Sequence, residues 1–274
     1  MDSLPRKCAV INDFSGFGRC SLAVALPVLS VMGVQCCSIP PAILSNHTGY
    51  DSYFFDSFTD KMPAYINEWK KLGLGFDLIF SGFLGCAEQI DLVCSFIDDF
   101  KSSKVIVDPV MGDNGKIYAT YTDEMCQKMR FLAEKADIIT PNITEACILA
   151  DKEYLGESIS DKQARSLVES LNLGGKRSVV ITGIHCGNKI KTALYDLETS
   201  EFNVICTDRA KITYPGTGDL FSSILCGATA QGESLLDATI KAAEFVSKAA
   251  IYTNRFETDI NDGIAFEKFL SELK

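Results

Sequence analysis

A glycine-rich turn that ends in an aspartate is the segment of this sequence best suited to chemistry. Residues 215–221 read Pro-Gly-Thr-Gly-Asp-Leu-Phe, and a mostly apolar helix is predicted over residues 220–231. Backbone N–H groups at such a helix start are unpaired and lie at the positive end of the helix dipole, so they form an anion site. Asp219 would repel phosphate there unless it accepts a proton, which indicates phosphoryl transfer to a hydroxyl. The alternative is that Asp219 only caps the helix.

A second candidate is the run Asn142-Ile143-Thr144-Glu145, which follows Pro141. One interpretation is a capping box, with Asn142 as N-cap and Glu145 three residues later. The other is that Asn142 and Glu145 serve a hydrated magnesium ion and phosphate oxygens. Both interpretations can hold together, because a helix N-terminus also attracts phosphate.

Two further loops carry polar side chains. Residues 108–115 place Asp108, Asp113 and two glycines together, which predicts either a simple turn or a mobile flap over a nucleotide, with a carboxylate near cations. Residues 45–50 read Ser-Asn-His-Thr-Gly-Tyr and are rich in hydrogen-bond donors and acceptors. His47 has no obvious nucleophile to activate, so the alternative there is a loop whose histidine is satisfied locally.

The elements that must position these residues alternate between short β-rich runs and helical patterns. Strands are predicted at residues 8–12, 35–39, 77–81, 104–108, 137–140, 178–182, 191–196 and 201–206, and several are continuous apolar runs typical of strands buried on both faces. Helices are predicted at residues 21–32, 87–101, 123–136, 161–171 and 234–253. The alternation predicts a single α/β domain over residues 1–274, with a doubly wound, mostly parallel central sheet flanked by helices. The strands on either side of residues 197–200 are expected to form a β-hairpin.

Candidate polar residues follow the predicted strand ends. Ligands of open α/β sheets bind beyond the carboxyl ends of the strands. The residues found there are Asn12, Asp13, Asp108, Thr140, Asn142, Thr182 and Gly183.

Composition excludes several classes of protein. A net charge of −10 argues against a nucleic-acid surface. Residues 20–45 carry no charge, but two internal glycine or proline breaks and a proline pair interrupt the run, so we expect no membrane span. The 11 cysteines show no C-x-x-C spacing and the chain has only two histidines, which disfavours zinc and predicts free thiols in the cytoplasm.

Taken together, the motifs resemble those of the pyridoxal/pyridoxamine kinases of the ribokinase-like superfamily. Five segments match that family in order along the chain. They are residues 45–50 (substrate loop), 81–89 (a strand end), 108–113 (flap), 137–145 (nucleotide and magnesium segment) and 216–221 (anion hole and base).

The resemblance implies a role for each matching position. Asp219 would be the catalytic base, and the amides of Gly216, Thr217 and Gly218 would form the anion hole. The residues implied to serve cations, Mg²⁺ and a monovalent ion (K⁺ or Na⁺), are Asp108, Thr140 and Glu145. The residues implied to contact ATP are Asp113, Asn142, Glu145, Thr182, Gly183, Gly216 and Gly218. The residues implied to contact the vitamin are Asp13, Ser15, His47, Thr48, Phe83 and Asp219.

One segment departs from that family. A serine usually follows its first strand, whereas residues 12–20 here begin Asn-Asp-Phe-Ser-Gly and are closer to the hydroxymethylpyrimidine kinases. Asp13 could accept a hydrogen bond from a ring nitrogen or an amino substituent, or it could cap the helix that follows.

The sequence therefore predicts an ATP-dependent kinase that phosphorylates the hydroxymethyl group of a B6 vitamer (pyridoxal, pyridoxamine or pyridoxine). The alternatives are a hydroxymethylpyrimidine kinase of the same fold and, in another class, a non-catalytic B6-binding protein. We expect small-molecule ligands, no nucleic acid or membrane partner, and a homodimer.

Overall fold

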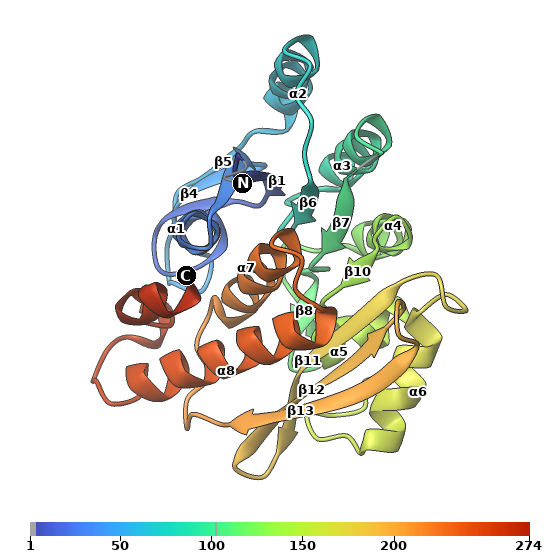
Figure 1. Ribbon diagram of the computed structural model, residues 1–274. Helices are drawn as coiled ribbons and strands as arrows, with labels where there is room; N and C mark the ends of the chain where they lie inside the picture. The colour runs from blue at the N-terminus through green and yellow to red at the C-terminus, as the bar shows by residue number, and fades with distance from the viewer. Residues whose placement is uncertain (1–3, 102) are drawn as a thin grey trace.

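The centre of the fold is an eight-stranded sheet (Figure 1). The computed structural model describes residues 4–101 and 103–274. The strands are β1 (Arg6–Ile11), β3 (Val34–Ile39), β6 (Leu78–Ser81), β7 (Lys104–Val107), β10 (Ile138–Ile139), β11 (Ser178–Cys186), β12 (Lys189–Asp196) and β13 (Glu201–Asp208). Their order is β13-β12-β11-β10-β7-β6-β1-β3, parallel from β3 to β11 and antiparallel from β11 to β13. Each predicted strand is thus confirmed, and β12–β13 is the predicted hairpin.

Both faces of the sheet are buried, as β1 illustrates. Ala9 and Ile11 belong to one hydrophobic core, whereas Cys8 and Val10 belong to the other. Side chains alternate across a strand, so a strand covered on both sides must be apolar at successive positions. This explains the uninterrupted apolar runs in the sequence.

Helices form the two outer layers. The core around Ile11 is completed by α2 (Met62–Lys71), α3 (Ala87–Asp99), α4 (Asp123–Glu134), α5 (Ile143–Leu149) and α6 (Asp161–Leu171). The core around Val10 is completed by α1 (Ser21–Val31), α7 (Thr217–Ala230) and α8 (Leu235–Thr253). Figure 1 shows α7 and α8 side by side on one face of the sheet. The predicted doubly wound α/β architecture is confirmed.

Several short elements were not predicted. β2 (Phe14–Phe17), β4 (Ala42–Asn46) and β5 (Phe55–Ser57) form a second, three-stranded sheet, and β8 (Gly112–Asp113) pairs with β9 (Lys116–Ile117). Three 3-10 helices complete the described part of the chain: η1 (Thr59–Lys61), η2 (Ile260–Asp262) and η3 (Glu267–Leu273). Most of these strands have two to four residues, too few to establish a period-2 pattern.

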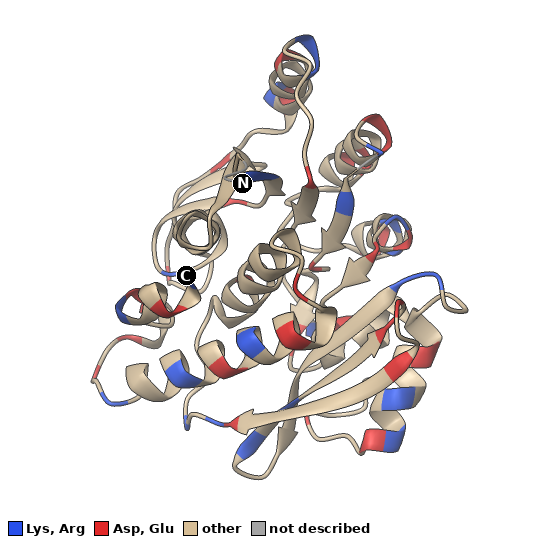
Figure 2. Ribbon diagram, viewed as in Figure 1, with Lys and Arg blue, Asp and Glu red and all other residues tan. Residues whose placement is uncertain are grey.

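The surface charge is mixed rather than segregated. Figure 2 shows acidic and basic residues interspersed along α6 and α8. Within the residues that the structure describes, no helix is both long enough and apolar enough to cross a membrane.

Candidate active site

The carboxyl edge of the sheet faces the start of α7. Asn12 and Asp108 directly follow β1 and β7. Asn12 donates from Nδ2 to Asp219 Oδ1 at 2.9 Å, across 207 positions of sequence. Ser222, one turn after Asp219 on α7, donates to Asp108 Oδ2 at 3.0 Å. Its hydroxyl also lies 3.0 Å from Thr140 Oγ1, so three predicted site residues meet at one edge of the sheet.

The glycine-rich turn opens α7 with its backbone amides available. The N-cap residue is Gly216, which has a left-handed φ of +79°, and no side chain among the described residues caps this helix. A Cβ at Gly216 would lie 1.8 Å from the carbonyl oxygen of Arg19, so only glycine fits. Because Asp219 is the third helical residue, it is not the N-cap. The first-turn amides therefore keep the anion-binding character that the sequence predicted.

Asp219 lies in a setting that favours its proton-bearing form. Burial raises its pKa above the usual range, while the Asn12 amide and the backbone N–H of Ser21 oppose that shift by donating to the carboxylate. A carboxylate with a raised pKa holds a proton more readily than a solvated one, as a general base requires. The geometry thus allows Asp219 to accept a proton from a hydroxyl that approaches the α7 turn.

Residues 142–145 start α5 and form a capping box. The capping box is present: Asn142 Oδ1 accepts from the Glu145 amide at 3.0 Å, and Glu145 Oε2 accepts from the Asn142 amide at 2.8 Å. Glu145 Oε1 also accepts from the Met111 amide at 3.2 Å, and Asn142 donates from Nδ2 to the Gly112 carbonyl at 2.8 Å. The capping alternative is confirmed, and the same pair supports the chain that enters the β8–β9 hairpin.

The donor chemistry fits a hydrated divalent cation. Asp108 and Glu145 are 6% and 4% exposed, and burial raises the pKa of both carboxyls. The charge of Asp219 adds to the shift at Asp108, and the charge of Asp108 adds to that at Glu145. Among the described residues, no group of three or more His, Cys, Asp or Glu could enclose a metal ion. Mg²⁺ usually keeps several waters and binds one or two carboxylates plus phosphate, so this sparse set suits it.

The predicted flap is a tight β-hairpin. Asp113 accepts from the Asn114 amide at 2.8 Å, and Asn114 and Gly115 both have positive φ. Gly115 donates to Thr144 Oγ1 at 2.9 Å, and a Cβ at Gly115 would lie 2.5 Å from the ring of Tyr154. The turn is confirmed, and Tyr154, which sequence reasoning missed, packs against it.

Thr182 and Gly183 lie inside β11, not at its end. The strand continues to Cys186 past an irregularity between Ile181 and Ile184, where Gly183 has φ +73°. Thr182 donates from its amide to the Pro141 carbonyl at 3.0 Å. This contact joins β11 to the segment that carries Asn142.

Asp13 and Ser15 form a buried network with the start of α1. Asp13 is 5% exposed, and its two carboxylate oxygens accept from Ser15 Oγ at 2.9 Å and Ser21 Oγ at 2.5 Å. Burial, assisted by the charge of Asp219, raises the pKa of Asp13 to about 6. The capping alternative is wrong: the N-cap of α1 is Cys20, no side chain of the described residues caps this helix, and Asp13 bonds to the Ser21 hydroxyl instead. A contact between Asp13 and substrate stays a prediction.

The other residues predicted to contact substrate are Phe83, His47 and Thr48. The Phe83 amide donates to Asn12 Oδ1 at 2.9 Å, so Phe83 and Asp219 bond to the same asparagine side chain. His47 accepts at Nδ1 from the Gly49 amide at 3.1 Å, and its Nε2 lies 2.7 Å from the Asn261 carbonyl oxygen. Both ring nitrogens are therefore occupied, as the structural alternative expected. Thr48 is exposed beside it.

One residue of the site was not singled out from the sequence. Asn12, selected by its position after β1, orients Asp219, whereas Ser222, which links Asp108 to Thr140, was missed. The three-residue spacing from Asp219 on one helix face could have selected Ser222.

Two surface cavities lie outside this buried network. The larger, of about 560 Å³, is lined by residues of β12, β13, the second half of α8 and η3. The smaller, of about 420 Å³, is lined by Phe17, Asn46, Tyr50, Asp51 and Ser52. The second cavity therefore opens on the predicted substrate loop.

The fold and the site define a kinase of the ribokinase-like class. A helix start with free amides and a half-buried acid beside it, at the carboxyl edge of a doubly wound sheet, suits the transfer of a phosphoryl group. The chain belongs to the phosphomethylpyrimidine kinase family, whose sequence profile matches residues 30–263.

Similar proteins carry more than one activity in their names. The thiamine biosynthetic bifunctional enzyme TH1 of Arabidopsis thaliana is 29% identical over 256 residues, 91% of this chain and 47% of that enzyme, so the chain spans about half its length. A Bacteroides thetaiotaomicron protein, provisionally assigned as a phosphomethylpyrimidine kinase, is 39% identical with a TM-score of 0.95, covering 100% of this chain and 95% of that one. Its crystal form with pyridoxal has a TM-score of 0.93, covering 98% and 96%. Pyridoxal kinase from Lactobacillus plantarum is 26% identical with a TM-score of 0.90, covering 99% and 97%.

Proposed function

We propose that this kinase transfers the γ-phosphoryl group of ATP to the hydroxymethyl group of a B6 vitamer. The observation that carries the proposal is the uncapped start of α7 with Asp219 held beside it by Asn12. The similar B. thetaiotaomicron protein, crystallised with pyridoxal, supports a B6 vitamer as the acceptor.

In this proposal Asp219 removes the hydroxyl proton as the oxygen attacks phosphorus. Asn12 donates to Oδ1 of Asp219 and so orients the carboxylate toward the acceptor. The amides of Gly216, Thr217 and Gly218 stabilise the charge on the transferring group. Mg²⁺, held through Glu145, would neutralise charge on the phosphates, and Asp108 with Thr140 would hold a monovalent cation.

The nucleotide would lie along the same edge. Asn142 and Glu145 provide a helix start, Thr182 and Gly183 provide backbone next to it, and the hairpin with Asp113 would cover the phosphates. Closing such a hairpin excludes water and limits hydrolysis of ATP.

Hydroxymethylpyrimidine is the second candidate acceptor. The family description and the Arabidopsis enzyme support it, and so does the Asn12–Asp13 segment. The test is kcat/KM for pyridoxal, pyridoxamine, pyridoxine and hydroxymethylpyrimidine with one preparation of protein. Phosphorylation of hydroxymethylpyrimidine alone would reject the B6 proposal. Binding of pyridoxal without ATP turnover would favour a non-catalytic binding protein.

A cytoplasmic location, a homodimeric state and one domain over residues 1–274 stay predictions. Size-exclusion chromatography with light scattering tests the oligomeric state.

Glu145→Gln should separate the metal role from the capping role. Glutamine keeps the length and one acceptor oxygen for the capping box, but it loses the oxygen that accepts from the Met111 amide and removes the charge near the cation. We expect a higher Mg²⁺ concentration at half-maximal rate and only a small fall in melting temperature. Thr144→Val serves as a control that perturbs the same helix without removing charge. Unchanged magnesium dependence would leave Glu145 with a structural role only.

Asp13→Ser should distinguish among acceptors. If Asp13 accepts from an amino substituent, its loss should reduce kcat/KM for pyridoxamine and hydroxymethylpyrimidine about ten- to hundredfold more than for pyridoxal. Ser15→Ala is the matched control, because it removes one hydrogen bond to the Asp13 carboxylate and keeps the carboxylate itself. An equal loss for every acceptor would show that Asp13 acts only through its bonds to Ser15 and Ser21.

A further inference from the structure

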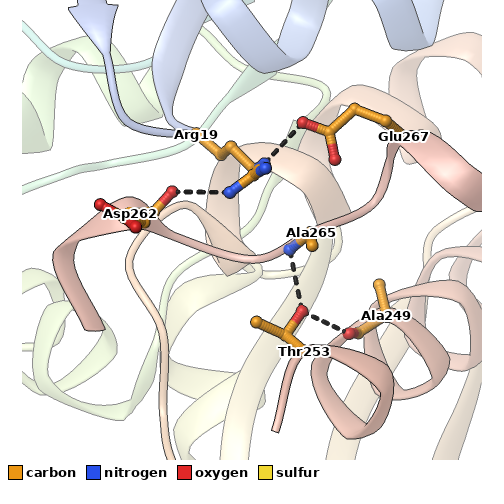
Figure 3. Close-up of polar contacts among 6 residues, drawn as sticks. All are labelled: Arg19, Ala249, Thr253, Asp262, Ala265 and Glu267. Carbon is orange, nitrogen blue, oxygen red and sulfur yellow. Dashed lines mark hydrogen bonds and ion pairs between the residues drawn. The ribbon is translucent and has the colours of Figure 1, made fainter. Parts of the chain in front are cut away.

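The chain after α8 returns to the active-site edge and is fixed there by its own core packing. Ile264 and Phe266 are 0% and 2% exposed and belong to the core shared by α1, α7 and α8. Thr253 at the end of α8 donates to the Ala249 carbonyl at 2.7 Å and accepts from the Ala265 amide at 2.8 Å (Figure 3). Residues 259–267, here called the C-terminal clamp, therefore have a defined position relative to α8.

The clamp holds the predicted substrate loop through two hydrogen bonds. Because His47 Nδ1 accepts from the Gly49 amide, the ring proton lies on Nε2, which donates to the Asn261 carbonyl at 2.7 Å. Tyr50 donates from its hydroxyl to Asp262 Oδ1 at 3.0 Å. The rings of His47 and Tyr50 also pack together, with centroids 4.9 Å apart.

The clamp also contacts the chain that supports the phosphate turn. Arg19 donates from Nε to Glu267 Oε1 at 2.5 Å and from Nη1 to the Asp262 carbonyl at 3.2 Å (Figure 3). Its backbone forms a parallel bridge with Gly263. The carbonyl of the same arginine lies against Gly216, where it excludes any Cβ. The clamp thus contacts both the predicted substrate loop and Arg19, the residue that packs against the phosphate turn.

We propose that the C-terminal clamp positions the substrate loop against the phosphate turn, with Asp262 and Arg19 as positioning residues. The proposal rests on the function proposed above, because it assumes that residues 45–50 contact the acceptor. Holding two reacting groups in register is a large part of catalysis by proximity, and small misplacements are costly. Sequence separation hides this role, since Asp262 lies 212 positions from Tyr50.

The electrostatics keep the Tyr50 hydroxyl in its protonated, donating form. Burial first, then the hydrogen bond to Asp262 and the charges of Asp262 and Asp259, raise the pKa of Tyr50 to about 12. The tyrosine hydroxyl therefore stays protonated and remains the donor.

The kinetic test is a double-mutant cycle between Tyr50 and Asp262. Asp262→Ala removes the acceptor and should raise KM for the vitamer about three- to tenfold, with KM for ATP changed less than about twofold. Asp262→Asn keeps Oδ1 as an acceptor and should restore near-wild-type KM. Tyr50→Phe should match Asp262→Ala, and the double variant should be no worse than either single one. Lys71→Ala, which breaks an exposed ion pair with Glu68 on α2, is the matched control.

Two kinetic results would overturn the proposal. Additive losses in the double variant would mean that Tyr50 acts on the acceptor independently of Asp262. Equal rises in both KM values, together with a lower melting temperature in Asp262→Ala, would mean that the clamp only stabilises the fold.

Hydrogen exchange tests the clamp without any turnover. In Asp262→Ala, amides in residues 46–54 should exchange faster, while those of β11 should be unchanged. Unchanged exchange in residues 46–54 would overturn the clamp, whatever the kinetics. Faster exchange together with a wild-type protein that phosphorylates no vitamer would count against the proposed function and leave the clamp supported.

Discussion

Asp219→Asn is expected to lower kcat by about 10²–10⁴ with ATP affinity largely retained, because it removes the proton acceptor and keeps the shape. The hydrogen bond from Asn12 can survive, since asparagine still presents Oδ1. A variant that keeps more than about a third of wild-type kcat would exclude Asp219 as the base, given what such a base contributes.

The pH profile supplies an independent check on Asp219. The base must be unprotonated to act, and burial raises its pKa, so the acid limb of the kcat profile should lie above the range of a solvated carboxylate. That limb should disappear in Asp219→Asn. Asn12→Ala is the matched control: it removes the orienting donor but leaves the base, so the rate should fall while the acid limb remains.

Gly216→Ala is expected to be the most damaging substitution in the turn. The residue has φ +79°, and a Cβ would lie 1.8 Å from the Arg19 carbonyl oxygen, which is backbone and cannot move aside. Left-handed backbone alone costs about 1–2 kcal/mol for a residue with a side chain. We expect a loss of kcat/KM well over tenfold, measured together with the melting temperature.

Gly218→Ala provides the comparison for this prediction. Its Cβ would find only Asp108 Oδ2 at 3.8 Å, and its backbone has no unusual φ. The variant should melt like the wild type, and any loss of rate must then come from the approach of the phosphate. If Gly216→Ala retained normal activity and stability, the packing of Arg19 against the turn would be unimportant.

The sequence contained enough information for the sheet and for most of the site. Strands buried on both faces are continuous apolar runs in the sequence, which is why β1, β7 and β11 could be found from the order of their residues alone. Asp108 and Thr140 could be selected because polar residues that follow such strands gather at one edge, and Asp219 because it follows a glycine-rich turn that opens a helix. The predicted strand and helix boundaries differ from the observed ones by a few residues. At β11, for example, Gly183 lets the strand continue to Cys186.

The parts that could not be predicted depend on contacts distant in sequence. Nothing near Asp13 shows that Ser15 and Ser21 occupy both of its oxygens, because that arrangement depends on how β2 turns into α1. Likewise, His47 is satisfied by a carbonyl 214 positions away. The two- and three-residue strands are stabilised by their partners and not by their own pattern.

The long separation of Asn12 and Asp219, 207 positions, has a consequence for folding. β1 lies between β3 and β6, yet the side chain that follows it is completed only by a helix from the last quarter of the chain. Contacts of this range carry a loop-closure cost before they give any stabilisation, and they slow folding. During synthesis, therefore, the predicted base cannot meet its orienting amide until most of the chain has left the ribosome.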